Sequence, residues 1–217
     1  MKIGFFSEST ADQAAIAIFT SGILGAPPEP IGMDLQGHGV TQVLGALQGV
    51  FRGLHYNSDA EGLVVVVDSD ETALHELSHD EPDGIDPDCR LCQVRSIIAQ
   101  VKKHLKPRAV LPELKVAVGL AVPAIEAWYL VGKDHQVGEA AWKVGLEGRR
   151  PFTRPQLKKM VYGTDRPSLE RETECAIREA TRIVNIEAIE AIENAFPAGF
   201  GSMAQEIRTW TQQRRAE

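Results

Sequence analysis

The strongest hydrophobic pattern in the chain is a run of four consecutive valines within residues 62–68. Turn-forming residues flank this run on both sides. Such a run is typical of a short strand that is buried on both faces, as strands of a parallel sheet are. Residues 114–122 form a second apolar run of this kind, and residues 2–6 predict a first strand at the N-terminus.

Between these strands, apolar residues recur at a helical spacing. We expect helices at residues 11–24, 40–51 and 91–105, and a further short strand at residues 31–35. Strands and helices therefore alternate over the first part of the chain, which predicts an α/β fold with a parallel sheet flanked by helices. The rest of the chain is expected to be helical, with candidate segments at residues 123–131, 155–162, 168–185 and 200–215.

Composition limits the size and class of the protein. The 217 residues, 43% of them hydrophobic, suffice for one large domain or one domain with an appendage. We expect an α/β domain at residues 1–135, with an insertion at about 70–95, and a helical extension packed on it at residues 136–217.

Charge and hydropathy bear on location and partners. No apolar run approaches the ~18 residues of a membrane span, and the apolar N-terminus is too short for a signal peptide. We therefore expect a cytoplasmic protein that does not bind a membrane. The net charge of −7 weakly disfavours a strongly basic nucleic-acid module but does not exclude a metal-dependent nuclease.

Acidic residues follow three of the expected strands. Glu8 comes after the first strand, Asp68 and Asp70 after the valine strand, and Glu126 after the last. The carboxyl ends of parallel strands lie at one edge of a sheet, where α/β proteins bind ligands. Carboxylate oxygens suit Mg²⁺ or Mn²⁺, so we expect a divalent-metal site there. Alternatively, the acids belong to polar turns and helix N-termini, where a negative charge is favourable by ~0.3–1 kcal/mol.

These acidic motifs, in this order after strands, resemble the Toprim (topoisomerase–primase) family. Within it, the chain resembles the Toprim-like proteins related to OLD (overcoming lysogenisation defect) nucleases and uncharacterised bacterial relatives. The family motif Glu-Gly-x-Thr-Asp/Glu corresponds to residues 8–12, where both acids match but the Gly and Thr do not. The second motif, Asp-x-Asp after a hydrophobic strand, is matched by Asp68-Ser69-Asp70.

Two further features belong to the same resemblance. The bacterial relatives carry a Pro-x-x-Glu-x-Trp segment, which is matched by Pro123, Glu126 and Trp128. They often have a downstream lysine in a short helix, for which Lys158 or Lys159 would stand. Both lysines can equally be ordinary residues of a helix surface.

The resemblance implies metal-dependent phosphoryl transfer on nucleic acid, as by a nuclease of phage defence or DNA repair. Glu8, Asp68 and Asp70 would hold one or two Mg²⁺ or Mn²⁺ ions, with Glu126 nearby. Glu8 could instead act as a general base, and Lys158 or Lys159 could neutralise the leaving phosphate. The changed Gly and Thr favour an alternative, a non-catalytic Toprim-like module that binds nucleic acid or a partner ATPase.

A second group of candidate ligands lies between the valine strand and the next helix. His75 and His79 are followed by Cys89 and Cys92, the His-x3-His and Cys-x2-Cys spacings of structural zinc sites. Two histidines at this spacing would share a helix face. The residues between are poor in core formers, so a bound zinc ion would help to order them.

Other interpretations of this group remain open. The histidines could be surface residues, the cysteines a reduced or redox-active pair, or an aspartate could replace one histidine as a ligand. Residues 75–79 also match the His-Glu-x-x-His pattern of zinc proteases, which makes a zinc-dependent hydrolase with Glu76 as its base a third candidate. The acidic residues around the motif disfavour it, because such helices are usually embedded in apolar sequence.

Overall fold

The structure is a computed structural model that describes residues 1–217 except 33–38, 110, 135, 149–151, 185 and 214–217. At its centre lies a four-stranded sheet in the order β2-β1-β3-β4, in which every neighbouring pair is parallel. All seven residues of the valine strand are buried, as a central parallel strand requires. The strands are β1 (Lys2–Phe6), β2 (Glu29–Ile31), β3 (Gly62–Asp68) and β4 (Lys115–Ala121).

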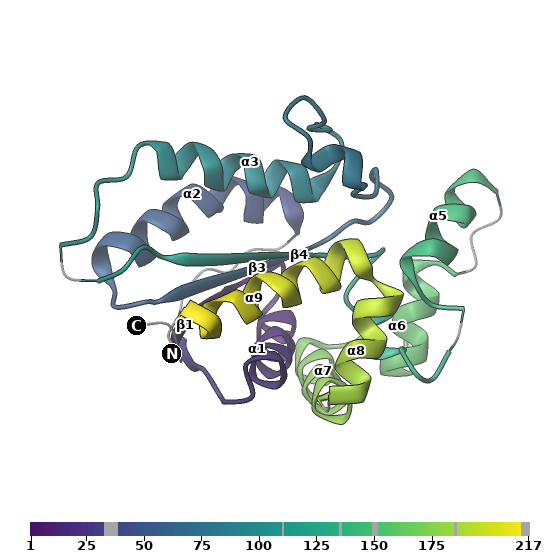
Figure 1. Ribbon diagram of the computed structural model, residues 1–217. Coiled ribbons are helices and arrows are strands. Elements are labelled where there is room, and N and C mark those ends of the chain that lie inside the picture. The colour runs from purple at the N-terminus through teal and green to yellow at the C-terminus, as the bar shows by residue number, and fades with distance from the viewer. Residues whose placement is uncertain (33–38, 110, 135, 149–151, 185, 214–217) are drawn as a thin grey trace.

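Helices cover both faces of the sheet (Figure 1). Helices α2 (Val40–Asn57) and α3 (Arg90–Lys103) pack together on one face, and α1 (Thr10–Leu24) and α9 (Ser202–Gln213) lie on the other. Helix α1 begins where the Ser9 side chain accepts a hydrogen bond from the Asp12 amide, and it ends at Gly25 in the left-handed conformation. The predicted α/β fold with flanking helices is therefore confirmed.

The C-terminal part is helical, as predicted. Helix α7 packs against α1, and α9 runs along β4 and covers it (Figure 1). The helices between β4 and α9 are α4 (Glu126–Tyr129), α5 (Glu139–Glu147), α6 (Arg154–Tyr162), α7 (Leu169–Ile183) and α8 (Ile186–Ala195), and a π-helical turn (Pro197–Gly201) precedes α9.

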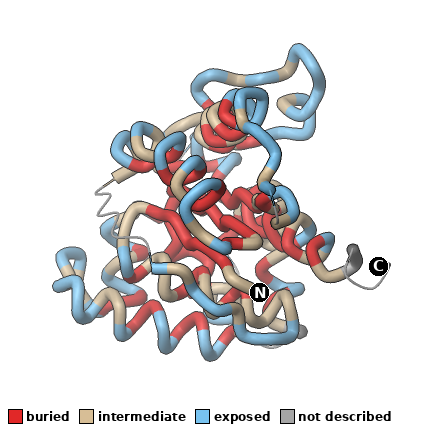
Figure 2. The backbone as a smooth tube through the Cα atoms, turned by 90° about the vertical axis from the view of Figure 1, so that its left-hand side faces the viewer, coloured by how far each residue is buried: buried red, intermediate tan, exposed pale blue. Residues whose placement is uncertain are grey.

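The hydrophobic core is continuous between the N-terminal and C-terminal parts. The Trp128 ring contacts Phe200 edge-on at 5.0 Å between ring centroids, and Phe19 of α1 contacts Phe200 at 5.5 Å. Figure 2 shows the buried segments, in red, gathered at the sheet and the inner sides of the helices. The C-terminal helix α9 thus shares with α1 the layer that covers one face of the sheet.

Several boundaries differ from the expected ones. Strand β2 spans Glu29–Ile31, and residues 33–35 of the expected strand lie outside the described residues. Helix α2 continues to Asn57 because Leu54 and His55 are still buried. Only Glu126–Tyr129 of the expected helix at 123–131 is α-helical, and α5 and α8 were not expected at all. Such short helices depend on packing more than on their own sequence.

Candidate metal-binding and active site

The topology creates a switch point between β1 and β3. The chain leaves β1 through α1 towards β2 and leaves β3 through α3 towards β4, so the two connections diverge on opposite faces of the sheet. Ligands of open α/β sheets bind at such points, beyond the carboxyl ends of the strands. Glu8 and Asp68 lie there, and Glu8 Oε1 accepts a hydrogen bond of 3.0 Å from the Asp68 amide.

The Asp68 carboxylate is buried, and each of its oxygens accepts a hydrogen bond. Its Oδ1 accepts from the Ile125 amide at 3.0 Å, and its Oδ2 accepts from Arg154 Nη2 at 2.7 Å. Burial raises the pKa of Asp68 well above its ordinary value, and the negative charge of Glu8 adds to this, while Arg154 opposes it. A cation at Asp68 would therefore relieve an unfavourable charge.

Asp70 lies beside Asp68 on a strained turn. Its φ of 49° falls in the left-handed region, and its amide donates to the carbonyl of Pro123 at 2.9 Å. One carboxylate oxygen pairs with Arg90 at 2.5 Å, and the other pairs with Arg154. Because one guanidinium contacts both Asp68 and Asp70, the two carboxylates face the same point.

Arg154 reaches this point from the helical C-terminal part. A capping box between Thr153 and Gln156 fixes the start of α6, whose first residue is Arg154. Arg90 is likewise the first residue of its helix. The N-terminus of a helix repels positive charge, so both arginines depend on the carboxylates they contact.

A second acidic group adjoins the first. Asp12, Glu126 and Glu172 come from α1, α4 and α7, and Lys158 Nζ lies 3.8 Å from Glu126 and 3.1 Å from Glu172. Burial, with the charge of Glu126, raises the pKa of Asp12 to about 7. Burial also raises the pKa of Glu126, against the opposing effect of Lys158.

The structure thus brings together most of the residues expected at the sheet edge. Glu8, Asp68, Asp70 and Glu126 lie near one another there with Lys158, whereas Lys159 is exposed on the same helix. Among the described residues, however, these carboxylates do not form a group whose ligand atoms lie close enough together to hold an ion. Sequence reasoning missed Arg90, Arg154 and Glu172, which lie far from the acidic motifs in the chain. Asp12 is the last residue of the first acidic motif, and its place in that motif could have identified it as a residue of the site.

The four predicted histidine and cysteine ligands also converge. The ligand atoms of His75, His79, Cys89 and Cys92 all lie within 4.8 Å of one another. Three Sγ-to-Nδ1 distances are 3.6–3.7 Å. A tetrahedral zinc ion, with bonds of ~2.3 Å to sulfur and ~2.0–2.1 Å to nitrogen, separates such atoms by about 3.6 Å. The group can therefore hold a metal ion.

The outer nitrogens of both histidines face carboxylates. His75 Nε2 lies 3.2 Å from Asp80, and His79 Nε2 lies 3.8 Å from Asp86. Where such a carboxylate accepts the Nε2–H, Nδ1 carries no proton and can bind a metal. Arg95 Nη1 also lies 3.4 Å from His75 Nε2. Burial lowers the pKa of His75, which also favours the neutral form that ligates.

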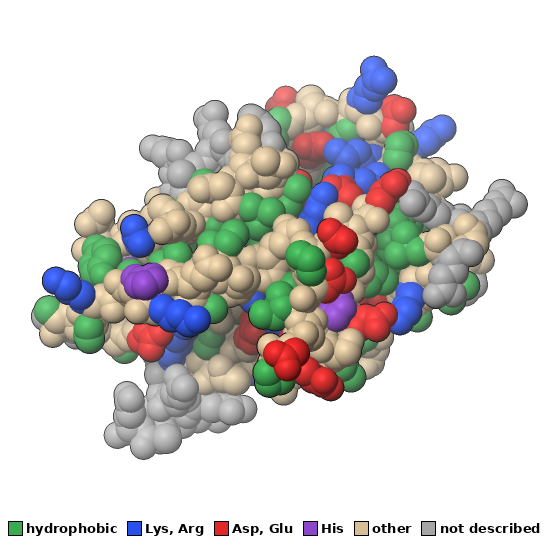
Figure 3. Space-filling view, turned by 90° about the horizontal axis from the view of Figure 1, so that it is seen from above, with side chains coloured by type: hydrophobic (Ala, Val, Ile, Leu, Met, Phe, Trp, Pro, Cys, Tyr) green, Lys and Arg blue, Asp and Glu red, His purple; other side chains and the backbone are tan. Residues whose placement is uncertain are grey.

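The path of the chain through this group differs from the expected one. The histidines do not share a helix face, because only Leu77–Asp80 forms a 3-10 helix and His75 precedes it. Burial raises the pKa of Cys89 to about 11, which is unlike a reactive redox thiol. Glu76 is exposed and pairs with Lys143 of α5 at 2.5 Å. The acidic residues Asp80, Glu81 and Asp83 that follow are exposed. In the view from above, acidic side chains gather beside a histidine (Figure 3).

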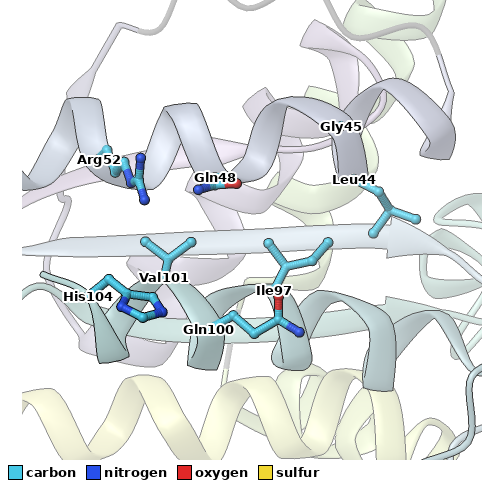
Figure 4. A pocket seen from close by; sticks show the side chains of 8 residues that line it. All are labelled: Leu44, Gly45, Gln48, Arg52, Ile97, Gln100, Val101 and His104. Carbon is cyan, nitrogen blue, oxygen red and sulfur yellow. The ribbon is translucent and has the colours of Figure 1, made fainter.

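Two hollows lie in the described part of the chain, and the larger one adjoins the histidine–cysteine group. A cavity of about 320 Å³ lies between α2 and α3, and neutral and basic side chains such as Gln48, Arg52 and His104 line it (Figure 4). A larger groove of about 1200 Å³ lies between residues 74–80 and α9, with His75, Leu77 and Glu139 in its lining. Neither hollow contains a residue of the acidic group at the sheet edge.

Among the described residues, no helix has both the length and the apolar character needed to cross a bilayer. Comparisons with protein-family models, curated proteins and solved structures found no match to this chain.

Proposed function

We propose that the protein carries out divalent-metal-dependent phosphoryl transfer on nucleic acid, as a nuclease. The observation that carries this proposal is the single guanidinium of Arg154, which contacts Asp68 Oδ2 and Asp70 Oδ1 beside Glu8. A positive charge placed between two carboxylates marks where a cation would bind. The resemblance to the Toprim family supports the same assignment.

Each residue of the group would have a separate task. Glu8, Asp68 and Asp70 would hold Mg²⁺ or Mn²⁺, which when bound supplies charge stabilisation and an activated water. Arg154 must withdraw from the carboxylates to admit the cation, and it then lies ready to contact a phosphate. Lys158, whose pKa is raised by Glu126 and Glu172 despite burial, keeps its positive charge for the same purpose.

A cleavage assay tests this proposal. Purified protein is incubated with plasmid, single-stranded DNA and RNA in Mg²⁺, Mn²⁺ or chelator. The isosteric variant Asp68→Asn with Asp70→Asn is expected to lose at least about 100-fold of the cleavage rate, because it removes two metal ligands. The variant Asp165→Asn, an exposed aspartate after α6, serves as the matched control. Metal-independent cleavage, or full cleavage by the double variant, would refute the proposal.

A non-catalytic module that binds nucleic acid or a partner ATPase is the second candidate. It is favoured by residues Ser9 and Ala11, which stand where the family's first motif has Gly and Thr. Folded protein that binds nucleic acid without cleaving it, in every metal tested, would support this candidate over the first. Either function is compatible with a role in phage defence or DNA repair.

We also propose that the ion held by His75, His79, Cys89 and Cys92 is a structural zinc. Two thiolates and two imidazoles suit Zn²⁺, and four protein ligands leave no position for a substrate. This ligand count and the pairing of Glu76 with Lys143 disfavour a zinc-dependent hydrolase.

Metal analysis tests this assignment. We expect one zinc per chain in the purified protein and less than about a tenth of that after Cys89→Ser with Cys92→Ser, because the remaining two ligands bind weakly. Cys175→Ser, which removes the buried thiol of α7, should leave the zinc content unchanged. A chain without zinc, or a double variant that retains it, would contradict the assignment.

A further inference from the structure

Arg90 physically joins the histidine–cysteine group to the acidic group. It lies between the two cysteine ligands in the chain, directly after Cys89 and two residues before Cys92. Its guanidinium donates to the backbone carbonyl of Asp68 at 2.5 Å and pairs with Asp70 Oδ2 at 2.5 Å. With only 12% of its side chain exposed, Arg90 is held in this position.

The two arginines at Asp70 occupy different sides of the carboxylate. Arg154 contacts Asp68 Oδ2 and Asp70 Oδ1, the pair of oxygens that face one point. Arg90 instead takes the other oxygen of Asp70 and a main-chain carbonyl. A cation can therefore replace Arg154 while Arg90 stays in place, so Arg90 can orient Asp70 without competing for its metal-facing oxygen.

Asp70 depends on such support. A left-handed backbone costs a non-glycine residue of order 1–3 kcal/mol unless its surroundings hold it there. Here the support is the hydrogen bond from its amide to Pro123 and the ion pairs with Arg90 and Arg154. Once Arg154 has moved to a substrate, Arg90 alone of these two arginines still fixes the Asp70 carboxylate.

The position of Arg90 depends in turn on the cysteines. The segment at residues 81–88, which leads into α3, is mostly exposed, and no helix or strand is assigned to it. Cys89 and Cys92 are buried and face His75 and His79. A metal ion bound by these four side chains would fasten the first turn of α3, which carries Arg90, to the loop that follows Asp70.

We propose that metal occupancy of the histidine–cysteine group positions Arg90, and that Arg90 thereby orders Asp68 and Asp70. Arg90 is a positioning residue, and the two groups form one coupled unit. The inference rests on the structural zinc proposed above. It bears on the proposed nuclease function only through the affinity of the acidic group for a cation.

Hydrogen–deuterium exchange of the zinc-loaded and zinc-depleted protein tests the coupling. The amides of Ser69 and Asp70 donate to the carbonyls of Ala121 and Pro123 and report on the turn. We expect these amides to exchange about tenfold faster after zinc depletion, an amount equivalent to about 1.4 kcal/mol. Arg90→Ala should show the faster exchange even with zinc bound, and depletion should add little to it.

Controls separate this effect from unfolding. The zinc-loaded Arg90→Ala measurement needs no depletion, so it stands even if the metal-free protein unfolds. A peptide covering β1 and α1 reports global opening in every sample. Lys102→Ala, which removes a cation from the last turn of the same helix, should behave as the wild type. Unchanged exchange in zinc-loaded Arg90→Ala, or an undiminished response of that variant to depletion without global opening, would overturn the proposal.

A second measurement links the coupling to the cation site. A single atom, Arg90 Nη1, contacts both the Asp68 carbonyl and Asp70 Oδ2. Arg90→Lys keeps the charge, but its ammonium ends one bond short of the Nη1 position and cannot make both contacts in the same geometry. We expect its affinity for Mn²⁺ to be about fivefold to tenfold weaker than that of the wild type. If the wild type binds no Mn²⁺ while the exchange result holds, the coupling stands and the metal-dependent function fails. Equal Mn²⁺ affinities of the two proteins would refute the role of Arg90 in positioning Asp70.

Discussion

Arg154 bridges two carboxylates of the acidic group, at the position where the proposed metal ion would bind. Its guanidinium contacts Asp68 and Asp70, and burial has already raised the pKa of Asp68. Removal of Arg154 takes away a positive partner of both carboxylates. It also removes the side chain that would compete with an incoming cation. Stability and metal binding should therefore respond to Arg154 in opposite directions.

Arg154→Ala is expected to lower the free energy of unfolding by ~1–3 kcal/mol without a divalent metal, because it leaves buried acceptors unpaired. Added Mn²⁺ should raise the melting temperature of the variant more than that of the wild type. Thermal unfolding with and without Mn²⁺ measures both effects, and Arg166→Ala at an exposed position is the matched control. A loss of stability that Mn²⁺ does not reduce would show that Arg154 does not occupy a cation site.

At the scale of elements, the π-helical turn Pro197–Gly201 fixes the C-terminal part to the end of β4. The carboxylate of Glu139 accepts hydrogen bonds from the amides of Ala198 at 3.0 Å and Gly199 at 2.7 Å. A side chain at Gly199 would overlap the carbonyl oxygen of Leu120 on β4. Gly199 is thus required because two backbone segments approach each other closely.

Two glycine substitutions should therefore have opposite effects. Gly199→Ala is expected to destabilise the fold by at least ~2 kcal/mol, since a rigid backbone atom must move to admit the methyl group. Gly49→Ala, on the exposed face of α2 with nothing within 4 Å of the new atom, should stabilise it by ~0.5–1 kcal/mol. Urea denaturation of both variants checks the pair. Equal effects would show that the turn does not pack against β4 as described.

At the scale of the whole molecule, a buried glutamate ties the C-terminal helices to the chain segment after α4. Glu179 of α7 accepts hydrogen bonds from Lys133 at 2.6 Å and Arg182 at 2.9 Å. Arg182 also donates to the carbonyl of Tyr129 in α4 at 2.8 Å. Burial alone would raise the pKa of Glu179, but these cations outweigh it and lower the pKa to about 2.

This lowered pKa predicts part of the acid sensitivity of the protein. A carboxylate with a lower pKa in the folded state stabilises the fold above its unfolded pKa of about 4.5, and that contribution is lost as the pH falls towards 2. Glu179→Gln should be less stable than the wild type at pH 7 by ~1–3 kcal/mol. The two proteins should converge near pH 2. Denaturation at a series of pH values measures the difference, and a gap independent of pH would contradict the ionised pair.

Much of the fold could be predicted from local patterns. The valine strand, the first strand and α1 follow from apolar runs and from the capping signal at Ser9, all of which act over a few residues. Helices α5 and α8 could not be predicted, because their stability comes from neighbours distant in the chain. Helix α4 is shorter than expected for the same reason, since tertiary packing determined where it ends.

The sequence by itself determined the α/β class and the positions of the acids after β1, β3 and β4. It also determined the spacing of the four histidine and cysteine residues. Tertiary structure alone decided that Arg90 and Arg154 meet at Asp70, that Lys158 rather than Lys159 reaches Glu126, and that Glu172 joins them. The reason is physical: patterns report the contacts of residues close in the chain, whereas these charges are brought together by the packing of α3, α6 and α7.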